Sequence, residues 1–204
     1  MGLKKKDLEI KLESIERHPD PKPELEQYTT LAPIASDIIF TAYTHHNVLG
    51  KKVADLGCGT GIFSIGAALA GAEEVLGYDI DEKSLEVAGK KAEEFSLSDR
   101  VEFLKRDVSD VDVKVDTVLM NPPFGAQKKG ADIPFLDKAF EIADFIYTIH
   151  NAVTEHFLRR YIKQEGHELF WEKRYMFDID NIFTFHEKEK EEFKVVSFGI
   201  KKRE

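Results

Sequence analysis

The tetrapeptide from Asn121 to Phe124, with Pro122 and Pro123 at its centre, is the stretch of this sequence best suited to chemistry. Two consecutive prolines fix two φ angles and favour extended geometry before them, so they hold the Asn121 amide in one orientation. An amide oxygen and a rigid carbonyl accept hydrogen bonds from an exocyclic amine, while an adjacent aromatic ring stacks on its heterocycle. The pattern predicts a site for a planar amine such as that of adenine. A proline-braced turn with Phe124 in the core is an equally good interpretation of these four residues alone.

A glycine-rich segment with Gly57, Cys58, Gly59 and Gly61 follows an apolar run that ends near Asp55. Glycines let the backbone turn tightly and approach a ligand closely where a strand leads into a helix. A dinucleotide-binding turn has the pattern G-x-G-x-x-G, whereas the third glycine here comes one residue early. Asp55 would repel a phosphate and suits a ligand that carries an ammonium group. The segment therefore disfavours a nicotinamide dehydrogenase and favours another cofactor, with Cys58 as a small residue of the turn.

Two further carboxylates end the next two predicted strands, Asp79 beside Ile80 and Asp107 beside Val108. Asp79 is placed to accept hydrogen bonds from both hydroxyls of a ribose, and Asp107 is placed near an adenine amino group. Each acid taken alone is better explained as a helix cap or a turn residue. Together with the glycine turn they predict an S-adenosylmethionine site, which includes the neighbouring Ile80 and Val108.

The predicted elements alternate between strands and helices, which is typical of a doubly wound α/β fold with a mostly parallel sheet. Ligands of such folds bind at the carboxyl ends of the strands. Thr30 is a plausible N-cap for the first helix, and the last two strands are expected to form an antiparallel hairpin at the sheet edge. The expected strands cover 52–56, 74–78, 101–104, 116–120, 145–150, 168–177 and 193–200, and the expected helices cover 31–43, 62–70, 81–95, 133–143 and 153–164.

The length of 204 residues predicts one domain over 1–204, in which 1–30 is a polar lead-in that closes over the cofactor. A single cysteine excludes an internal disulfide, and the cysteine and histidine spacings give no metal site. No apolar run reaches the roughly 20 residues of a membrane span, and the first residues lack a signal peptide pattern. We expect a cytoplasmic protein.

The formal net charge of −9 argues against nonspecific wrapping of nucleic acid. Local basic surfaces are still present, and each is more simply explained as a solvated face. Lys128 and Lys129 are the exception, because they follow the Asn121 turn directly. We expect them to hold a substrate phosphate while the base enters the site.

Four spaced motifs carry a resemblance to known enzymes: Leu25–Thr30, Ala54–Gly59, Gly77–Glu82 and Val118–Gly125. They resemble those of the Rossmann-like class I methyltransferases that act on amines, and most closely the methyltransferase-like protein five family. The resemblance runs from Leu25 through the C-terminal strands. It implies methylation of an adenine N6 in small-subunit ribosomal RNA, with Asn121, Pro122, Pro123 and Phe124 as the catalytic turn.

The same resemblance implies that Gln27, Tyr28 and Thr29 close over the methionine end of S-adenosylmethionine. It also implies a small zinc-binding activator protein as a partner that pairs along a sheet edge. Two other functions stay open at this point. One is methylation of a glutamine side chain in a protein, for which a tyrosine is commoner than Phe124. The other is a noncatalytic, cofactor-binding scaffold for ribosome assembly, against which the intact Asn121 argues.

Overall fold

The computed structural model describes residues 2–16, 18, 21, 26, 29–124, 130–178 and 192–203. Its helices are α1 (Lys5–Glu13), α2 (Ala32–Thr44), α3 (Ile62–Leu69), α4 (Glu82–Glu94), α5 (Ile133–Ile142) and α6 (Glu155–Gln164), with short 3-10 helices η2 (Val108–Asp110) and η3 (Ala152–Thr154). Its strands are β1 (Lys52–Leu56), β2 (Glu74–Asp79), β3 (Val101–Lys105), β4 (Val115–Met120), β5 (Ala143–Asn151), β6 (Glu168–Asp178) and β7 (Glu192–Lys201).

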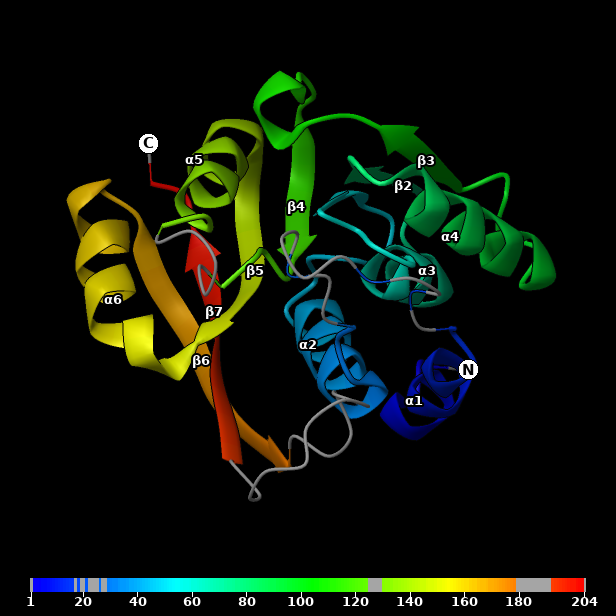
Figure 1. The fold of residues 1–204 in the computed structure, drawn as a ribbon, viewed down its shortest axis with the longest axis horizontal. Helices are drawn as coiled ribbons and strands as arrows, with labels where there is room; N and C mark the ends of the chain where they lie inside the picture. Colours follow the sequence, from blue (N-terminus) through cyan, green and yellow to red (C-terminus); the bar gives the residue numbers. More distant parts are fainter. Residues whose placement is uncertain are drawn as a thin grey trace.

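The strands form one seven-stranded sheet in the order β3-β2-β1-β4-β5-β7-β6 (Figure 1). Strands β1 to β5 pair in parallel, whereas β7 runs antiparallel to both β5 and β6. The predicted doubly wound sheet with an antiparallel C-terminal hairpin is therefore confirmed. Because the five parallel strands end at one edge, the turns after β1, β2, β3 and β4 lie close together there.

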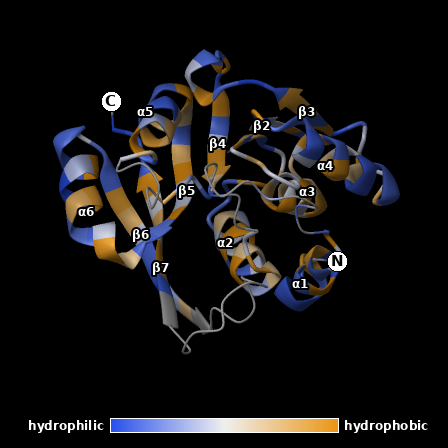
Figure 2. Cartoon of the chain, in the orientation of Figure 1, coloured by the Kyte–Doolittle hydropathy of each residue, from blue (hydrophilic) through white to orange (hydrophobic). Residues whose placement is uncertain are grey.

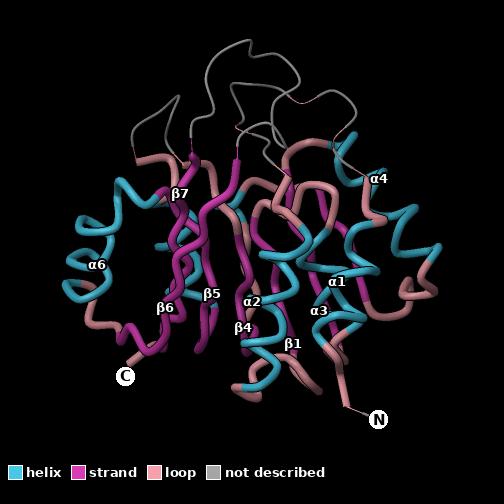
Figure 3. Tube along the Cα trace, turned by 90° about the horizontal axis from the view of Figure 1, so that it is seen from below, coloured by secondary structure: helices cyan, strands magenta, loops and turns pink. Residues whose placement is uncertain are grey.

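Helices cover both faces of the sheet, so each central strand contributes side chains to two apolar clusters. In β4, Leu119 belongs to the cluster under α1, α2 and α3, whereas Val118 and Met120 belong to the cluster under α5 and α6. This alternation follows from the two-residue period of a strand. Figure 3 shows α1, α2 and α3 together on one face, and Figure 2 shows hydrophobic and hydrophilic residues alternating along α6.

Two expectations for the N-terminal region were wrong. The lead-in contains helix α1, whose sequence gives only a weak signal. Its Leu8 and Leu12 lie one turn apart, and each is buried in the core with 1% of its surface exposed. The N-cap of α2 is Leu31, and Pro33 stands in its first turn. Thr30 is not the cap, and its hydroxyl instead contacts a side chain that is distant in the sequence. None of the helices in the described ranges is long and apolar enough to cross a membrane.

Candidate active site

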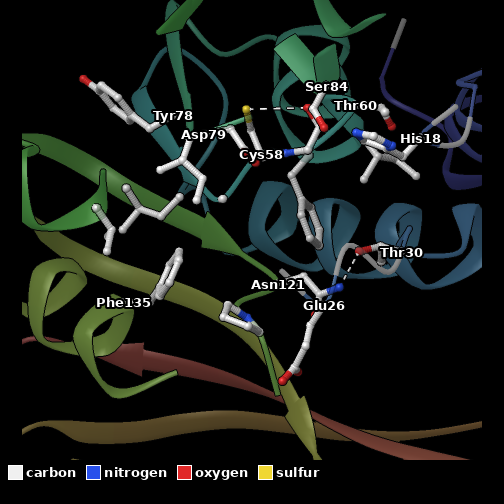
Figure 4. Close-up of a pocket in the computed structure, with 18 of the residues that line it drawn as sticks. His18, Glu26, Thr30, Cys58, Thr60, Tyr78, Asp79, Ser84, Asn121 and Phe135 are labelled. Carbon is white, nitrogen blue, oxygen red and sulfur yellow. Dashed lines mark hydrogen bonds between the residues drawn. The ribbon is translucent and has the colours of Figure 1, made fainter. Parts of the chain in front are cut away.

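A cavity of about 280 Å³ opens at the carboxyl ends of β1, β2 and β4 (Figure 4). Segments that are distant in the sequence line it: the N-terminal segment before α2, the glycine turn with the start of α3, the end of β2 with the start of α4, the start of η2, the turn after β4 and the start of α5. Among the residues predicted for the site, the cavity is lined by Thr29, Gly57, Cys58, Gly59, Asp79, Ile80, Asp107, Val108, Asn121 and Pro123.

The glycine turn is fixed to the neighbouring strand by its backbone. The amides of Gly57 and Cys58 both donate to the carbonyl oxygen of Tyr78, at 2.8 and 2.9 Å. Gly59 has a φ of 53°, and a Cβ at this position would meet no atom within 4 Å. The turn therefore presents bare backbone to the cavity at Gly59, which leaves room for a ligand to approach closely. Gly61 is packed against Ala88 and Phe103 and faces away from the cavity lining.

Asp79 joins the glycine turn to the start of α4. Its Oδ2 accepts a hydrogen bond from the Gly59 amide at 2.8 Å, and its Oδ1 accepts one from the Asp81 amide at 2.9 Å. Burial raises the pKa of Asp79, while these two hydrogen bonds oppose that shift. Each carboxylate oxygen has a second lone pair, so Asp79 can still accept hydrogen bonds from a ligand in the cavity.

Asp55 does not line the cavity, in contrast to the expectation that it meets an ammonium group directly. It faces α3 from the middle of the sheet, where its Oδ2 accepts hydrogen bonds from the amide and the hydroxyl of Ser64 at 2.9 and 2.7 Å. Its side chain is buried and its Oδ1 accepts no hydrogen bond from a described residue. Burial, which outweighs the Ser64 hydrogen bonds, raises the pKa of Asp55 to about 7.

Replacing Asp55 by asparagine should change how stability depends on pH in the cofactor-free protein. The pKa of Asp55 rises from its usual 3.8 to about 7 on folding, so the folded protein keeps a proton that the unfolded chain releases between these values. The stabilisation by this proton is complete below about pH 4 and is lost as the pH rises through about 7. We expect the free energy of unfolding of wild type, relative to Asp55→Asn, to fall by up to about 3 kcal/mol from pH 4.5 to 8. Denaturant titrations over this range test it, and a difference that does not vary with pH would contradict it.

The side of the cavity near η2 combines an acid with apolar surface. Asp107 is the N-cap of η2 and is exposed, and its Oδ1 accepts hydrogen bonds from the amide and hydroxyl of Ser109 at 2.9 and 2.7 Å. These bonds lower the pKa of Asp107. Ile80, 47% exposed, and Val108 line the cavity beside it. This arrangement provides apolar contacts for a flat heterocycle and an acceptor for an amine at its edge.

Asn121 holds its amide in one orientation through a residue that is remote in the sequence. Its Nδ2 donates to the Thr30 hydroxyl at 3.0 Å, across 91 positions of the chain (Figure 4). Its Oδ1 is buried and accepts no hydrogen bond from any described residue. A buried acceptor without a donor costs free energy, so this atom is a specific place for an incoming N–H group.

The other residues of the predicted turn do not all reach the cavity. Pro123 lines it, whereas Pro122 is buried and is not among the lining residues. Phe124 is partly buried and packs against the apolar cluster on the α1, α2 and α3 face, and it is not among the lining residues. Gln27, Tyr28, Lys128 and Lys129, which were also predicted for the site, lie outside the described residues.

Several residues that line the cavity were not predicted for the site. His18 comes from the N-terminal segment, and its Nε2 lies 2.5 Å from Oδ2 of Asp81 at the start of α4. Phe135 comes from the first turn of α5, and its ring packs closely against Gly57. A Cβ atom added to Gly57 would lie only 3.1 Å from this ring. The others are Glu26, Thr30, Thr60, Ser84, Arg106 and Ala131. Only packing of distant segments brings them together.

The lining residues fit S-adenosylmethionine, the cofactor predicted from the sequence. Open space at the bare Gly59 backbone suits a close approach by an amino acid group, and the Asp79 carboxylate suits a ribose. The apolar side chains of Ile80, Val108 and Phe135 suit an adenine ring.

Comparisons with known proteins agree with this assignment. A family model described as the methyltransferase small domain matches residues 33–142. The rRNA N(6)-adenosine-methyltransferase METTL5 of Danio rerio is 35% identical, over 95% of this chain and 96% of that protein. An uncharacterized protein of Methanocaldococcus jannaschii is 43% identical, over 98% of this chain and 95% of that protein. A crystal structure of a candidate RNA methyltransferase from Pyrococcus horikoshii is similar with a TM-score of 0.89 and 37% identity, over 97% and 98% of the two chains.

Proposed function

We propose that this chain, which belongs to the methyltransferase small-domain family and within it to the METTL5 family, methylates the N6 amine of an adenine in small-subunit ribosomal RNA. Its cofactor is S-adenosylmethionine. The observation that supports the proposed acceptor is the Asn121 amide. Its nitrogen donates to the Thr30 hydroxyl, and its buried oxygen accepts no hydrogen bond from the described part of the chain. An exocyclic amine supplies the missing N–H group.

The role of Asn121 in the proposed reaction is to orient a weak nucleophile. The lone pair of an adenine amine is delocalised into the ring, so the nitrogen attacks poorly until it becomes pyramidal. Hydrogen bonds from its two N–H groups to Asn121 Oδ1 and the Pro122 carbonyl favour that geometry and direct the lone pair at the reacting carbon. Because Thr30 fixes the Asn121 amide beforehand, little reorganisation accompanies the reaction.

Bound S-adenosylmethionine supplies a methyl group on a positively charged sulfur. The amine nitrogen held by Asn121 would take up this methyl group as the carbon–sulfur bond breaks, and S-adenosylhomocysteine would be the leaving group. The methylated nitrogen then loses its extra proton to water, since it is strongly acidic. No side chain of the cavity has to act as a general base in this proposal.

The remaining predicted site residues have supporting roles in the proposal. Phe124, which is only partly buried, stacks on an adenine swung out of its RNA context and contributes about 1 to 3 kcal/mol of binding. Lys128 and Lys129 hold a neighbouring phosphate. Gln27, Tyr28 and Thr29 close over the methionine end of the cofactor, and Thr29, the one of the three that the structure describes, lines the cavity. Asp55 has an indirect role, because it accepts hydrogen bonds from Ser64 and so fixes the start of α3 next to the cofactor site.

Removal of the Thr30 hydroxyl tests whether Asn121 must be held in place. We expect Thr30→Val to lower kcat about tenfold, because the Asn121 amide becomes free to rotate, while Thr30→Ser keeps nearly full activity. The affinity for S-adenosylmethionine, measured by calorimetry, serves as the control and should change less than about threefold. Equal kcat values for Thr30→Val and wild type would show that the amide needs no such support.

Nucleoside mass spectrometry tests the proposed substrate. Cells that lack the protein should lose N6-methyladenosine from small-subunit ribosomal RNA, and purified protein with S-adenosylmethionine should restore it to that RNA. Labelled methyl groups found in a protein fraction and not in RNA would instead favour the glutamine methyltransferase. Loss of function in cells without any loss of methylation would favour the noncatalytic scaffold.

A zinc-binding activator protein is the proposed partner. The sheet has two edge strands, β3 and β6, to which another chain can add a strand. Addition of such an activator to the purified chain should raise both its melting temperature and its methylation rate. Full activity of the chain alone, with no change on addition, would argue against this partner.

A further inference from the structure

Helix α6 exposes an unusual combination of aromatic and basic side chains. Phe157 is 47% exposed and its ring stacks on that of Tyr161, with 6.0 Å between the ring centroids and 17° between the planes. Val153, just before the helix, is 89% exposed. The opposite side of the helix is anchored by Leu158 and Ile162, which are buried in the core. Leu158 and Ile162 therefore anchor α6, whereas Val153 and Phe157 remain exposed.

The basic residues of α6 divide into a paired and an unpaired set. Arg159 is bound by Glu155 and by Glu172, so its charge is already neutralised. Arg160 and Lys163 are exposed, and neither has a carboxylate partner in the described part of the chain. Arg160 and Lys163 therefore give α6 a local positive charge in a protein whose formal net charge is −9.

The spacing of these side chains places them on one face. His156, Arg160 and Lys163 follow one another at intervals of four and three residues, which brings them into one row along the helix, and Phe157 lies beside that row. The row extends over about 10 Å, since an α-helix rises 1.5 Å per residue. We refer to Val153, His156, Phe157, Arg160 and Lys163 as the α6 face.

The α6 face begins near the carboxyl ends of the parallel strands, where the candidate active site lies. Met120, the last residue of β4, pairs with Thr148 of β5, so His150 is level with position 122 of the Asn121 turn. Asn151 ends β5, and η3 and α6 follow directly. A substrate strand that extends from the acceptor site across the end of β5 therefore meets Val153 first and then the rest of the α6 face.

We propose that the α6 face binds the RNA strand that flanks the methylated adenine, an inference that rests on the proposed function. Arg160 and Lys163 attract the phosphates, and a base stacks on the exposed Phe157 ring. A positively charged track with an aromatic ring is the usual combination for binding single-stranded nucleic acid. Because Arg160 and Lys163 have no carboxylate partner in the described part of the chain, they can contact phosphates without breaking an ion pair.

Neutralisation of the two cations is the most direct test. In Arg160→Gln/Lys163→Gln we expect the Kd for fluorescent single-stranded RNA to rise about tenfold, and the slope of log Kd against log salt to fall by about 0.7 for each lost contact. With ribosomal RNA as substrate, KM should rise while kcat stays unchanged. Phe157→Ala should weaken binding about fivefold or more, with little change in the salt slope.

Lys90→Gln on α4 is the matched control, because Lys90 is also exposed and has no carboxylate partner in the described residues. It should leave RNA affinity and salt slope as in wild type. Melting temperature and S-adenosylmethionine affinity should be unchanged in every variant. If wild type methylates and binds RNA but the α6 variants match Lys90→Gln, the α6 face is not the binding surface. If wild type binds RNA without methylating it, the proposed function fails while the α6 face is still judged by affinity. If wild type does neither, both fail.

Discussion

Asn121→Ala will lower kcat by about two to three orders of magnitude and leave the affinity for S-adenosylmethionine within about threefold of wild type. The alanine removes the buried Oδ1, which has no donor among the residues that the structure describes, and this atom is the proposed acceptor for the amine. Loss of one preorganised hydrogen bond to the reacting group typically has an effect of this size. Cofactor affinity is expected to survive because the glycine turn and Asp79 are untouched.

Single-turnover methylation of RNA and calorimetry with the cofactor separate the two effects. Asn121→Asp is the conservative variant, because it keeps an acceptor oxygen at the same place while the Thr30 hydroxyl can donate to the second one. It should recover part of the rate that the alanine loses. An unchanged kcat in Asn121→Ala, in protein that melts like wild type, would eliminate the proposed mechanism.

Asp79→Ala is expected to weaken S-adenosylmethionine binding by about one to two orders of magnitude. Two effects combine here: the carboxylate is the proposed partner of the ribose hydroxyls, and it also holds the amides of Gly59 and Asp81. Hydrogen bonds to a charged group each contribute about 1.5 to 3 kcal/mol, so their joint loss is large. The glycine turn should then also lose its fixed conformation.

Asp79→Asn separates these contributions, because its side-chain oxygen can still accept one backbone hydrogen bond. We expect its cofactor affinity to lie between wild type and Asp79→Ala, as measured by calorimetry at constant pH. The melting temperature of the cofactor-free variants shows how much of the loss comes from the turn itself. Equal cofactor affinity in wild type and Asp79→Ala would exclude Asp79 from the binding site.

Most of the fold follows from local sequence patterns. The first strand was predicted with its observed bounds, Lys52–Leu56, and the other strands differ from prediction by at most a few terminal residues. Apolar runs of this length between glycine and charged segments specify buried parallel strands. Helix α1 was missed because two leucines one turn apart are a weak signal among polar residues, and only contact with the core makes them visible.

The sequence by itself determined which residues stand at the ends of the parallel strands, namely the glycine turn, Asp79, Asp107 and the Asn121 turn. Strand period and chain order suffice for this, since parallel strands bring their carboxyl ends to one edge. Only the tertiary structure decided which side chains meet there. It turned Asp55 under α3 and brought Thr30 to Asn121 across 91 positions. Such contacts depend on how whole elements pack, and no pattern within either segment encodes them.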